Sequence, residues 1–262
     1  MTLTPRVLVT TAALGLVLTA CGSTSTASPG AGGSSSPAVT GTITVLAASS
    51  LQEAFTTIGK QFEAAHPGVK VVFSFAASSA LATQITQGSP ADVFASASTK
   101  NMTQVVSAGY ASAPTTFVKN TMEIALPPSN PAAVTMLSDL SKPSVKVALC
   151  QPQVPCGSTA AEVFTNAGIT VKPVTLEADV KAVLTKVELD EVDAGVVYVT
   201  DVRAAGSKVV GLTIPASVNA STSYPIAALT KSTNSATADA FVAYVLSPAG
   251  MAVLSADGFA KP

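Results

Sequence analysis

Small hydroxyl residues stand where predicted strands pass into predicted helices. Ser50 follows an apolar run at residues 43–48, and Ser78 follows a second run at 69–77. A serine hydroxyl has one proton and two lone pairs, so it can bind the backbone and still donate to an anion. Ser50 with Glu53 three residues later fits a capping box. Because a serine before a helix is most often only a cap, each junction alone is weak evidence for a site.

Two further junctions offer backbone donors. Cys156 lies in the segment Pro155-Cys156-Gly157-Ser158, which follows the apolar run 145–150 and opens a predicted helix. Asp179 is the predicted N-cap of another helix, and Val180 is then its first residue, whose N–H has no partner inside the helix. Helix N-termini bind anions through such free N–H groups and through the helix dipole. Four junctions with neutral donors therefore predict a site that holds a dianion.

Strand and helix patterns alternate along the chain and place these junctions. Strands are predicted at 43–48, 69–77, 91–98, 122–127, 145–150, 194–200 and 224–230, and helices at 51–65, 79–87, 158–167, 180–189 and 236–246. This order predicts an α/β fold of mainly parallel sheets flanked by helices. Ligands of open α/β sheets bind beyond the carboxyl ends of the strands, where the junctions lie. Two lobes, with the last segment returning to the first lobe, explain so many segments better than one sheet.

The first residues have the pattern of an export signal. One positive charge in MTLTPR precedes an uncharged apolar run that ends at Leu18-Thr19-Ala20-Cys21. This ending looks like a lipobox, so we expect a signal peptide at 1–20 and a lipid anchor on Cys21 that holds the protein at the outer face of the cytoplasmic membrane. An ordinary secretory signal with an incidental cysteine is the alternative. Residues 21–40 are rich in Gly, Ser, Thr and Ala and predict a flexible linker.

The charge inventory excludes several classes of function. The chain has 14 Lys+Arg and 15 Asp+Glu, and removal of Arg6 with the signal leaves 13 against 15, a net charge of −2. No basic block is present, so a nucleic-acid partner has no electrostatic support. Arg203 is then the only arginine and His66 the only histidine. An amino-acid receptor, a metal centre and a serine hydrolase are all disfavoured, the last because no G-x-S-x-G motif or general base is found. We therefore expect no enzyme and no cofactor.

Two cysteines remain once Cys21 is assigned to the lipid. Cys150 and Cys156 are separated by five residues, a span that a disulfide bridges if the loop turns back. Disulfides persist in exported proteins. We predict a Cys150–Cys156 disulfide, with two inert thiols as the alternative.

Three stretches together resemble a known family. They are TVLAASSL, FSFAASSALATQITQGSPADVFASAS, and LEADV followed by DAGVVY. In this order and spacing, Gly41 to Pro262 resembles the periplasmic molybdate-binding proteins of molybdate ABC transporters. The resemblance implies a two-lobed clamp of the periplasmic-binding-protein type II fold, with lobe 1 at 41–119 and 225–262 and lobe 2 at 120–224. It implies that a monomer captures molybdate or tungstate by hinge closure, with crossings near 118–121 and 223–227, and delivers it to a membrane permease.

The resemblance also assigns the binding residues. Ser50 and Ser78 would donate hydroxyl and backbone N–H bonds, Cys156 and Val180 backbone N–H bonds, and Tyr198 its phenol from the second lobe. The family usually has a small residue such as alanine in place of Cys156, so a disulfide there would change the stiffness of the loop. Sulfate, which differs from molybdate mainly in size, stays an alternative ligand. Phosphate is often protonated near neutral pH and needs an acceptor, a role that no acid matched to this site fills.

Overall fold

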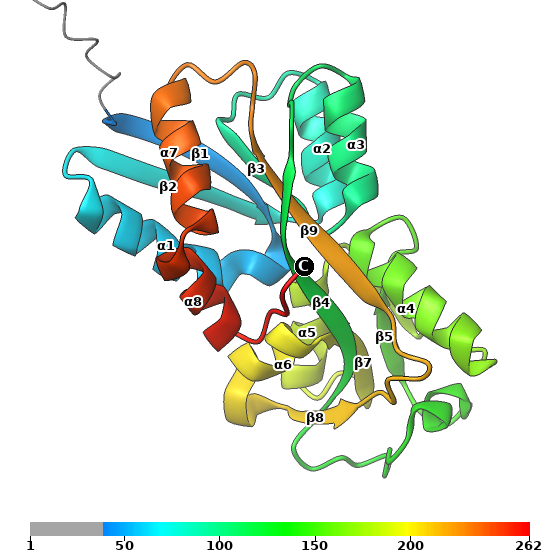
Figure 1. Cartoon of the computed structure of the whole chain (residues 1–262). Helices are drawn as coiled ribbons and strands as arrows, with labels where there is room; N and C mark the ends of the chain where they lie inside the picture. Colours follow the sequence, from blue (N-terminus) through cyan, green and yellow to red (C-terminus); the bar gives the residue numbers. More distant parts are fainter. Residues whose placement is uncertain (1–38) are drawn as a thin grey trace, which may run out of the picture. The chain divides into compact units, whose positions relative to one another are not determined.

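The computed structural model describes residues 39–262, and the predicted signal peptide 1–20, the lipidated Cys21 and nearly all of the linker lie outside them. The described residues form an α/β fold with nine strands in the order β2-β1-β3-β9-β4-β7-β5-β6, with β8 paired to β4 (Figure 1). The strands are β1 Gly41–Ala48, β2 Val69–Ala76, β3 Val93–Ala95, β4 Thr115–Leu126, β5 Val147–Cys150, β6 Thr175–Glu177, β7 Ala194–Tyr198, β8 Val210–Thr213 and β9 Ser221–Ala228.

Eight α-helices flank these strands in the described part of the chain. They are α1 Gln52–Ala65, α2 Ser78–Thr86, α3 Thr99–Ser107, α4 Pro155–Ala167, α5 Val180–Glu188, α6 Val199–Ala205, α7 Ser235–Leu246 and α8 Pro248–Ala256. Short 3-10 helices cover Ser49–Leu51, Leu137–Ser141 and Gly206–Lys208. The predicted α/β fold with flanking helices is confirmed, and its sheet is mixed. The strand β1 pairs in parallel with β2 and β3, and β5 with β6 and β7, whereas β9 pairs antiparallel with β3 and β4, and β4 also pairs antiparallel with β7 and β8.

Every predicted strand and helix is present, with shifted ends. The helix predicted from residue 158 begins at Pro155, because proline is favoured in the first turn of a helix. The strand predicted at 194–200 ends at Tyr198, where Asp201 accepts the Tyr198 N–H and starts α6. The prediction missed α3, α6, α8, β6 and β8, which are short or follow another element directly.

The first half of the fold comprises β1, β2, β3 and β9 with α1, α2, α3, α7 and α8. Its core follows the alternation of side chains in β1. Ile43, Val45 and Ala47 are fully buried against α1, α7 and α8, whereas Leu46 points to the other face, where α2 and α3 pack. Aromatic side chains fill the first of these faces, as Phe55 and Phe62 of α1 both contact Phe241 of α7. Burial on both faces explains why this strand is a nearly continuous apolar run.

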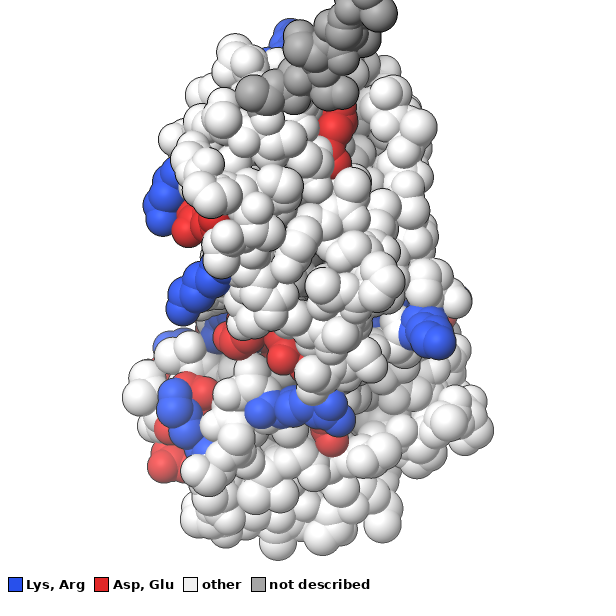
Figure 2. Space-filling view, turned by 60° about the vertical axis from the view of Figure 1, so that its left-hand side comes forward, with Lys and Arg blue, Asp and Glu red and all other residues white. Residues whose placement is uncertain are grey.

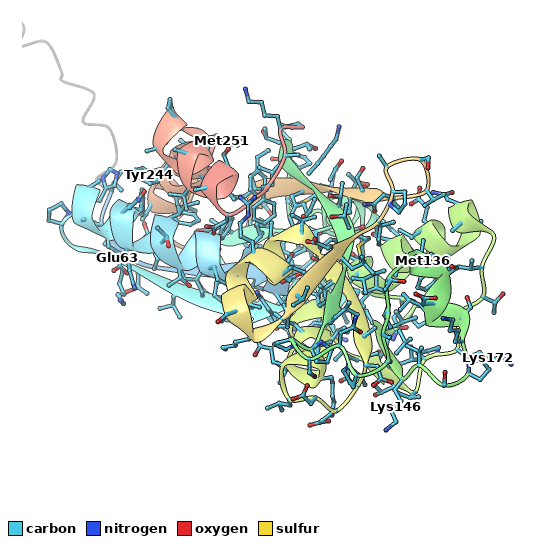
Figure 3. The ribbon with its side chains drawn as sticks, turned by 90° about the horizontal axis from the view of Figure 1, so that it is seen from below. Glu63, Met136, Lys146, Lys172, Tyr244 and Met251 are labelled. Atoms are coloured by element: carbon cyan, nitrogen blue, oxygen red, sulfur yellow. A yellow bond between two sulfur atoms is a disulfide. The ribbon has the colours of Figure 1, made fainter. Side chains whose placement is uncertain are left out.

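The second half comprises β5, β6, β7 and β8 with α4, α5 and α6, and it has its own core around β5 and β7. Val147 and Val196, on neighbouring strands, are fully buried beneath α4 and α5. The view from below separates the two halves, with Tyr244 and Met251 at one end and Lys146 and Lys172 at the other (Figure 3).

The strand β4 belongs to both halves. Its residues Thr115–Thr121 pair antiparallel with β9, and its residues Met122–Leu126 pair with β7 and β8. The crossings predicted near 118–121 and 223–227 fall in the β4–β9 pairing. The exact lobe boundaries at 119/120 and 224/225 stay a prediction.

The described residues contain no single helix that is long and apolar enough to cross a membrane. The helices α7 and α8 reach that length and composition only together, and they are bent by 57°. Their apolar side chains are used inside the protein, because Phe241, Val245 and Leu254 are fully buried in the first half's core.

Candidate functional site

A small cavity lies where the two halves of the described chain meet. The space open to the centre of a water-sized sphere is ≈ 10 Å³, which is room for about one water molecule. All five predicted binding residues line it: Ser50, Ser78, Cys156, Val180 and Tyr198. The remaining lining residues are Ala48, Ser49, Ala76, Ala77, Ala97, Pro155 and Asp179. The structure thus brings the predicted set together, while its role in binding stays a prediction.

The topology explains why these residues converge. Ser50 and Ser78 follow the carboxyl ends of β1 and β2 in the first half, and Val180 follows that of β6 in the second. Cys156 follows β5, and Tyr198 is the last residue of β7. Because β1 and β2 run parallel, as do β5, β6 and β7, the carboxyl ends within each half lie at one edge of the sheet.

Ser78 lines the cavity and has a hydroxyl that accepts one hydrogen bond. It is the first residue of α2, but its side chain does not cap the helix, so the predicted capping role is wrong. Its Oγ instead accepts the N–H of Ala97 at 2.9 Å. A hydroxyl that accepts one hydrogen bond still has its own proton to donate, and Ser78 is 1% exposed.

The predicted capping box of Ser50 and Glu53 is also wrong. Ser50 lies in the 3-10 helix before α1, and its Oγ is 2.8 Å from the Tyr224 hydroxyl rather than bonded to the helix N-terminus. Glu53 points to Lys181 of the other half. No local sequence pattern indicates Tyr224 as the partner, because it lies 174 residues further along the chain.

Cys156 and Val180 line the cavity at the starts of two helices. They are the second residue of α4 and the first of α5, so neither N–H has an acceptor inside its helix. The predicted N-cap at Asp179 is confirmed, since its Oδ1 accepts the N–H groups of Lys181 and Ala182 at 2.8 and 3.1 Å. Asp179 is the one charged residue among those that line the cavity, and this capping directs Oδ1 toward the helix.

Tyr198 contributes a hydroxyl without a partner. The residue is 1% exposed, and its Oη has no hydrogen-bond partner among the described residues. Thr159 is close enough to lower the pKa of Tyr198 slightly, but its hydroxyl donates to the Pro155 carbonyl. Burial dominates and raises this pKa well above its ordinary value, so the phenol keeps its proton. A buried hydroxyl without a partner is costly and indicates a ligand position.

A cluster of three charged groups joins the two halves beside the cavity. Lys181 Nζ lies 2.8 Å from Glu53 Oε2 of α1 and 3.1 Å from Asp201 Oδ1 of α6. Burial opposes the charge on Lys181, but the two carboxylates outweigh it and raise the lysine's pKa. Asp201 is fully buried and its Oδ2 also accepts the Tyr198 N–H, so the cluster fixes the backbone of one lining residue. The Lys181 ammonium is therefore neutralised next to the cavity.

Charge is sparse elsewhere on the molecule. On the face in Figure 2, acidic and basic side chains are mixed in the lower part of the view, and most of the surface carries neither. Arg203, the one arginine of the described residues, donates to the Ala256 carbonyl at 3.0 Å and does not line the cavity. No group of three His, Cys, Asp or Glu residues that could hold a metal ion occurs between residues 39 and 262.

The predicted disulfide is confirmed, with Cys150 and Cys156 joined by an S–S bond and their Cα atoms 5.8 Å apart. The bridge ties the end of β5 to the first turn of α4, and so to the loop that presents the Cys156 N–H. The turn is tight, because a side chain at Gly157 would meet the Gln151 carbonyl oxygen at 2.1 Å. The bridge and this close approach together fix the position of the backbone donor.

Comparison with known proteins places the chain in a family. A family model described as bacterial extracellular solute-binding protein matches residues 43–260. The chain belongs to this family of solute-binding proteins. It is 46% identical over 246 residues to the "Molybdate-binding protein ModA" of Mycobacterium tuberculosis, an alignment that covers 94% of this chain and 93% of that protein.

A second curated protein agrees in length, and a solved structure agrees in fold. The "Putative ABC transporter substrate-binding lipoprotein YvgL" of Bacillus subtilis is 33% identical, over 83% of this chain and 86% of that protein. The solved structure of the periplasmic molybdate-binding protein of Azotobacter vinelandii matches with a TM-score of 0.76 at 20% identity, over 84% of this chain and 99% of that chain. The two-lobed binding-protein fold predicted from the sequence is thereby confirmed.

Removal of Lys181 tests the charge cluster. Lys181→Met leaves the fully buried Asp201 carboxylate without its counter-ion and should lower the free energy of unfolding by about 3–5 kcal/mol. Glu53→Gln is the matched control and should cost less than about 1 kcal/mol, because its side chain is 44% exposed. The Lys181→Met deficit should shrink as the pH falls, since a protonated Asp201 carries no charge. Urea denaturation measures both, and equal losses in the two variants would contradict the assignment.

The disulfide should add modest stability. Because the bridge spans only 6 positions, the chain-entropy relation predicts that Cys150→Ser/Cys156→Ser lowers the free energy of unfolding by about 2 kcal/mol. Urea denaturation of the oxidised protein and the double variant measures this difference. Thiol titration of the unfolded, unreduced protein is the control, and reactive thiols at both positions would show that the bridge does not form.

Proposed function

We propose that this chain is the substrate-binding protein of an ABC importer and that it captures molybdate, with tungstate as a second ligand. The ion is held between the two lobes by Ser50, Ser78, Cys156, Val180 and Tyr198. No catalytic step and no cofactor are part of this function. The protein works as a monomer and delivers the ion to a membrane permease.

The unpartnered Tyr198 hydroxyl carries this proposal. Tyr198 lines the cavity together with Ser78, which has a hydroxyl proton to donate, and with Cys156 and Val180, whose N–H groups lie at helix starts. All of these groups donate hydrogen bonds, so their natural complement is a ligand that only accepts them. A fully deprotonated oxyanion has that property. Hydrogen bonds to charged groups contribute about 1.5–3 kcal/mol each, so a handful of them outweighs the costs of desolvation and closure.

The chemistry of the donors separates this ligand from its rivals. An amino acid needs a cationic partner for its carboxylate and an acid for its amine, whereas Arg203 does not line the cavity and Asp179 Oδ1 caps α5. A protonated phosphate needs an acceptor, and the polar atoms described around the cavity are mainly donors. The 46% identity to a molybdate-binding protein supports molybdate over sulfate.

Closure of the two lobes explains how a buried site fills and empties. At ≈ 10 Å³ the cavity is too small to hold an oxyanion without movement of the protein. The strands β4 and β9 connect the halves, and the Glu53–Lys181 ion pair spans them on the cavity side. We infer that the halves part about these strands, that the ion binds to Ser50 and Ser78, and that the second half then closes over it.

The lipid anchor on Cys21 is part of the proposal. It is supported by the Leu18-Thr19-Ala20-Cys21 sequence and by the lipoprotein among the relatives. An anchored binding protein stays close to its permease at the outer face of the cytoplasmic membrane, because lipid chains hold it there.

Calorimetry of the purified protein against four anions tests the proposed ligand. Molybdate and tungstate should bind at least about a hundredfold more tightly than sulfate, a difference of about 2.7 kcal/mol, because a rigid set of donors fits one ion size. Phosphate should bind more weakly still. Equal affinity for sulfate and molybdate would refute the assignment.

Two variants verify where the ion binds in the same titration. Ser78→Ala and Tyr198→Phe each remove one donor to a charged ligand and should each weaken molybdate binding by about 1.5–3 kcal/mol. Tyr110→Phe, far from the cavity in the first half's second core cluster, is the control and should bind as the wild type does. A variant at Ser78 or Tyr198 with unchanged affinity would remove that residue from the site.

Replacement of Cys21 tests the anchor independently of the ligand. Cys21→Ala should release the protein from membranes into the soluble fraction, since no thiol remains to carry the lipid. Its affinity for molybdate should not change, because Cys21 is distant in sequence from every proposed binding residue. Membrane fractionation and calorimetry measure the two effects, and a variant retained on membranes would exclude this anchor.

A further inference from the structure

Ser50 stands between two cavities and has one proton to give. Its first neighbour is the small cavity with Ser78 and Tyr198. The second is a larger space of ≈ 270 Å³ whose lining includes Glu53 and Asp257. A carboxylate can accept a hydroxyl proton. If the Ser50 O–H points into the larger cavity, Ser50 cannot donate to an anion in the small cavity. For Ser50 to act as a donor in the small cavity, a neighbouring group must fix the orientation of its hydroxyl.

Tyr224 is placed to do this. Its Oη lies 2.8 Å from Ser50 Oγ, and the tyrosine is fully buried. It does not line the small cavity, so it would act on a ligand only through Ser50. Burial raises the pKa of Tyr224 above its ordinary value, and its phenol therefore keeps a proton to donate.

Asn120 determines which way the Tyr224 proton points. The amide oxygen of Asn120 accepts the Thr121 N–H at 3.1 Å, which turns its NH2 group toward Thr200 and Tyr224. This NH2 donates to Thr200 Oγ1 at 2.8 Å and lies 3.5 Å from Tyr224 Oη. An amide NH2 cannot accept a hydrogen bond. Of the two described groups within hydrogen-bond distance of Tyr224 Oη, Ser50 Oγ is therefore the one that can accept the Tyr224 proton.

We propose that Tyr224, oriented by Asn120, donates to Ser50 and thereby fixes Ser50 as a hydrogen-bond donor to the anion in the small cavity. This inference rests on the proposed function of the cavity as an oxyanion site. Tyr224 is a positioning residue, because it touches Ser50 and not the ligand. The chain of donors runs from Asn120 to Tyr224 to Ser50 and ends in a proton that faces the cavity.

The relay also ties the donor to the strands that connect the halves. Asn120 is on β4 and Tyr224 is on β9, within the segment where these two strands pair. Thr200, the other acceptor of the Asn120 amide, is on α6 of the second half. The relay therefore links Ser50 of the first half to Thr200 of the second through the two connecting strands.

A double-mutant cycle with molybdate as the probe tests the relay. Ser50→Ala should weaken binding by roughly ten- to a hundredfold, the loss of one hydrogen bond to a charged group. Tyr224→Phe should weaken binding by at least about threefold, within the usual range for directly coupled side chains. In the Ser50→Ala background Tyr224→Phe should have no further effect, because the hydroxyl through which it acts is absent. Calorimetry gives the four dissociation constants.

Matched variants separate this effect from a general disturbance. Tyr244→Phe removes a phenol hydroxyl from α7 at one end of the molecule (Figure 3). Tyr244 does not line the cavity, so this variant should leave affinity unchanged. If Tyr224→Phe does not fold, Asn120→Ala takes its place and should likewise lose its effect in the Ser50→Ala background. Equal effects of Tyr224→Phe with and without Ser50, or wild-type affinity in Tyr224→Phe, would overturn the relay. A wild-type protein that does not bind molybdate would instead refute the proposed function.

Discussion

The antiparallel pairing of β4 with β9 is the constraint on which the rest of this structure depends. Each strand also pairs with another strand: β9 pairs with β3 in the first half, and β4 pairs with β7 in the second. The parallel strands of the two halves are thereby held with their carboxyl ends around one small space. Helices and short turns begin at those ends, and their free N–H groups and hydroxyls meet there. The cavity is thus a consequence of the topology, to which single side chains add only the last donors.

Neutral donors and buried charge are kept apart around this cavity. Lys181 directly follows Val180, which lines the cavity. Its ammonium group is paired with Glu53 and Asp201. The donors that remain are backbone N–H groups and hydroxyls, which are fixed in place by a helix start, a disulfide or a hydrogen bond from another strand. Fixed neutral donors select for ion size and for full deprotonation, because they cannot move to follow a different ligand. This arrangement suits a binding protein that must release its ion as well as capture it.

The sequence predicted the parts of this structure that are local or repeated along the chain. Asp179 as an N-cap, the Cys150–Cys156 bridge and the order of strands and helices all follow from neighbouring residues. The partners of the serines could not be predicted in this way. Ser50 and Glu53 have the spacing of a capping box. The hydroxyl of Ser50 is nevertheless bonded to the buried phenol of Tyr224, and Ser50 lies in a 3-10 turn before the start of α1. The strand-to-helix junctions predicted that Ser50, Ser78, Cys156 and Val180 lie together, and the family resemblance added Tyr198. The Asn120–Tyr224 relay was visible only in three dimensions.

The most direct test of the central claim is a crystal structure with molybdate in which anomalous scattering locates the molybdenum. We expect one strong peak between the two halves, with oxygens within hydrogen-bond distance of Ser50, Ser78 and Tyr198 and of the N–H groups of Cys156 and Val180. A peak at another place, such as beside Arg203 in the larger cavity, with the small cavity unoccupied, would contradict it.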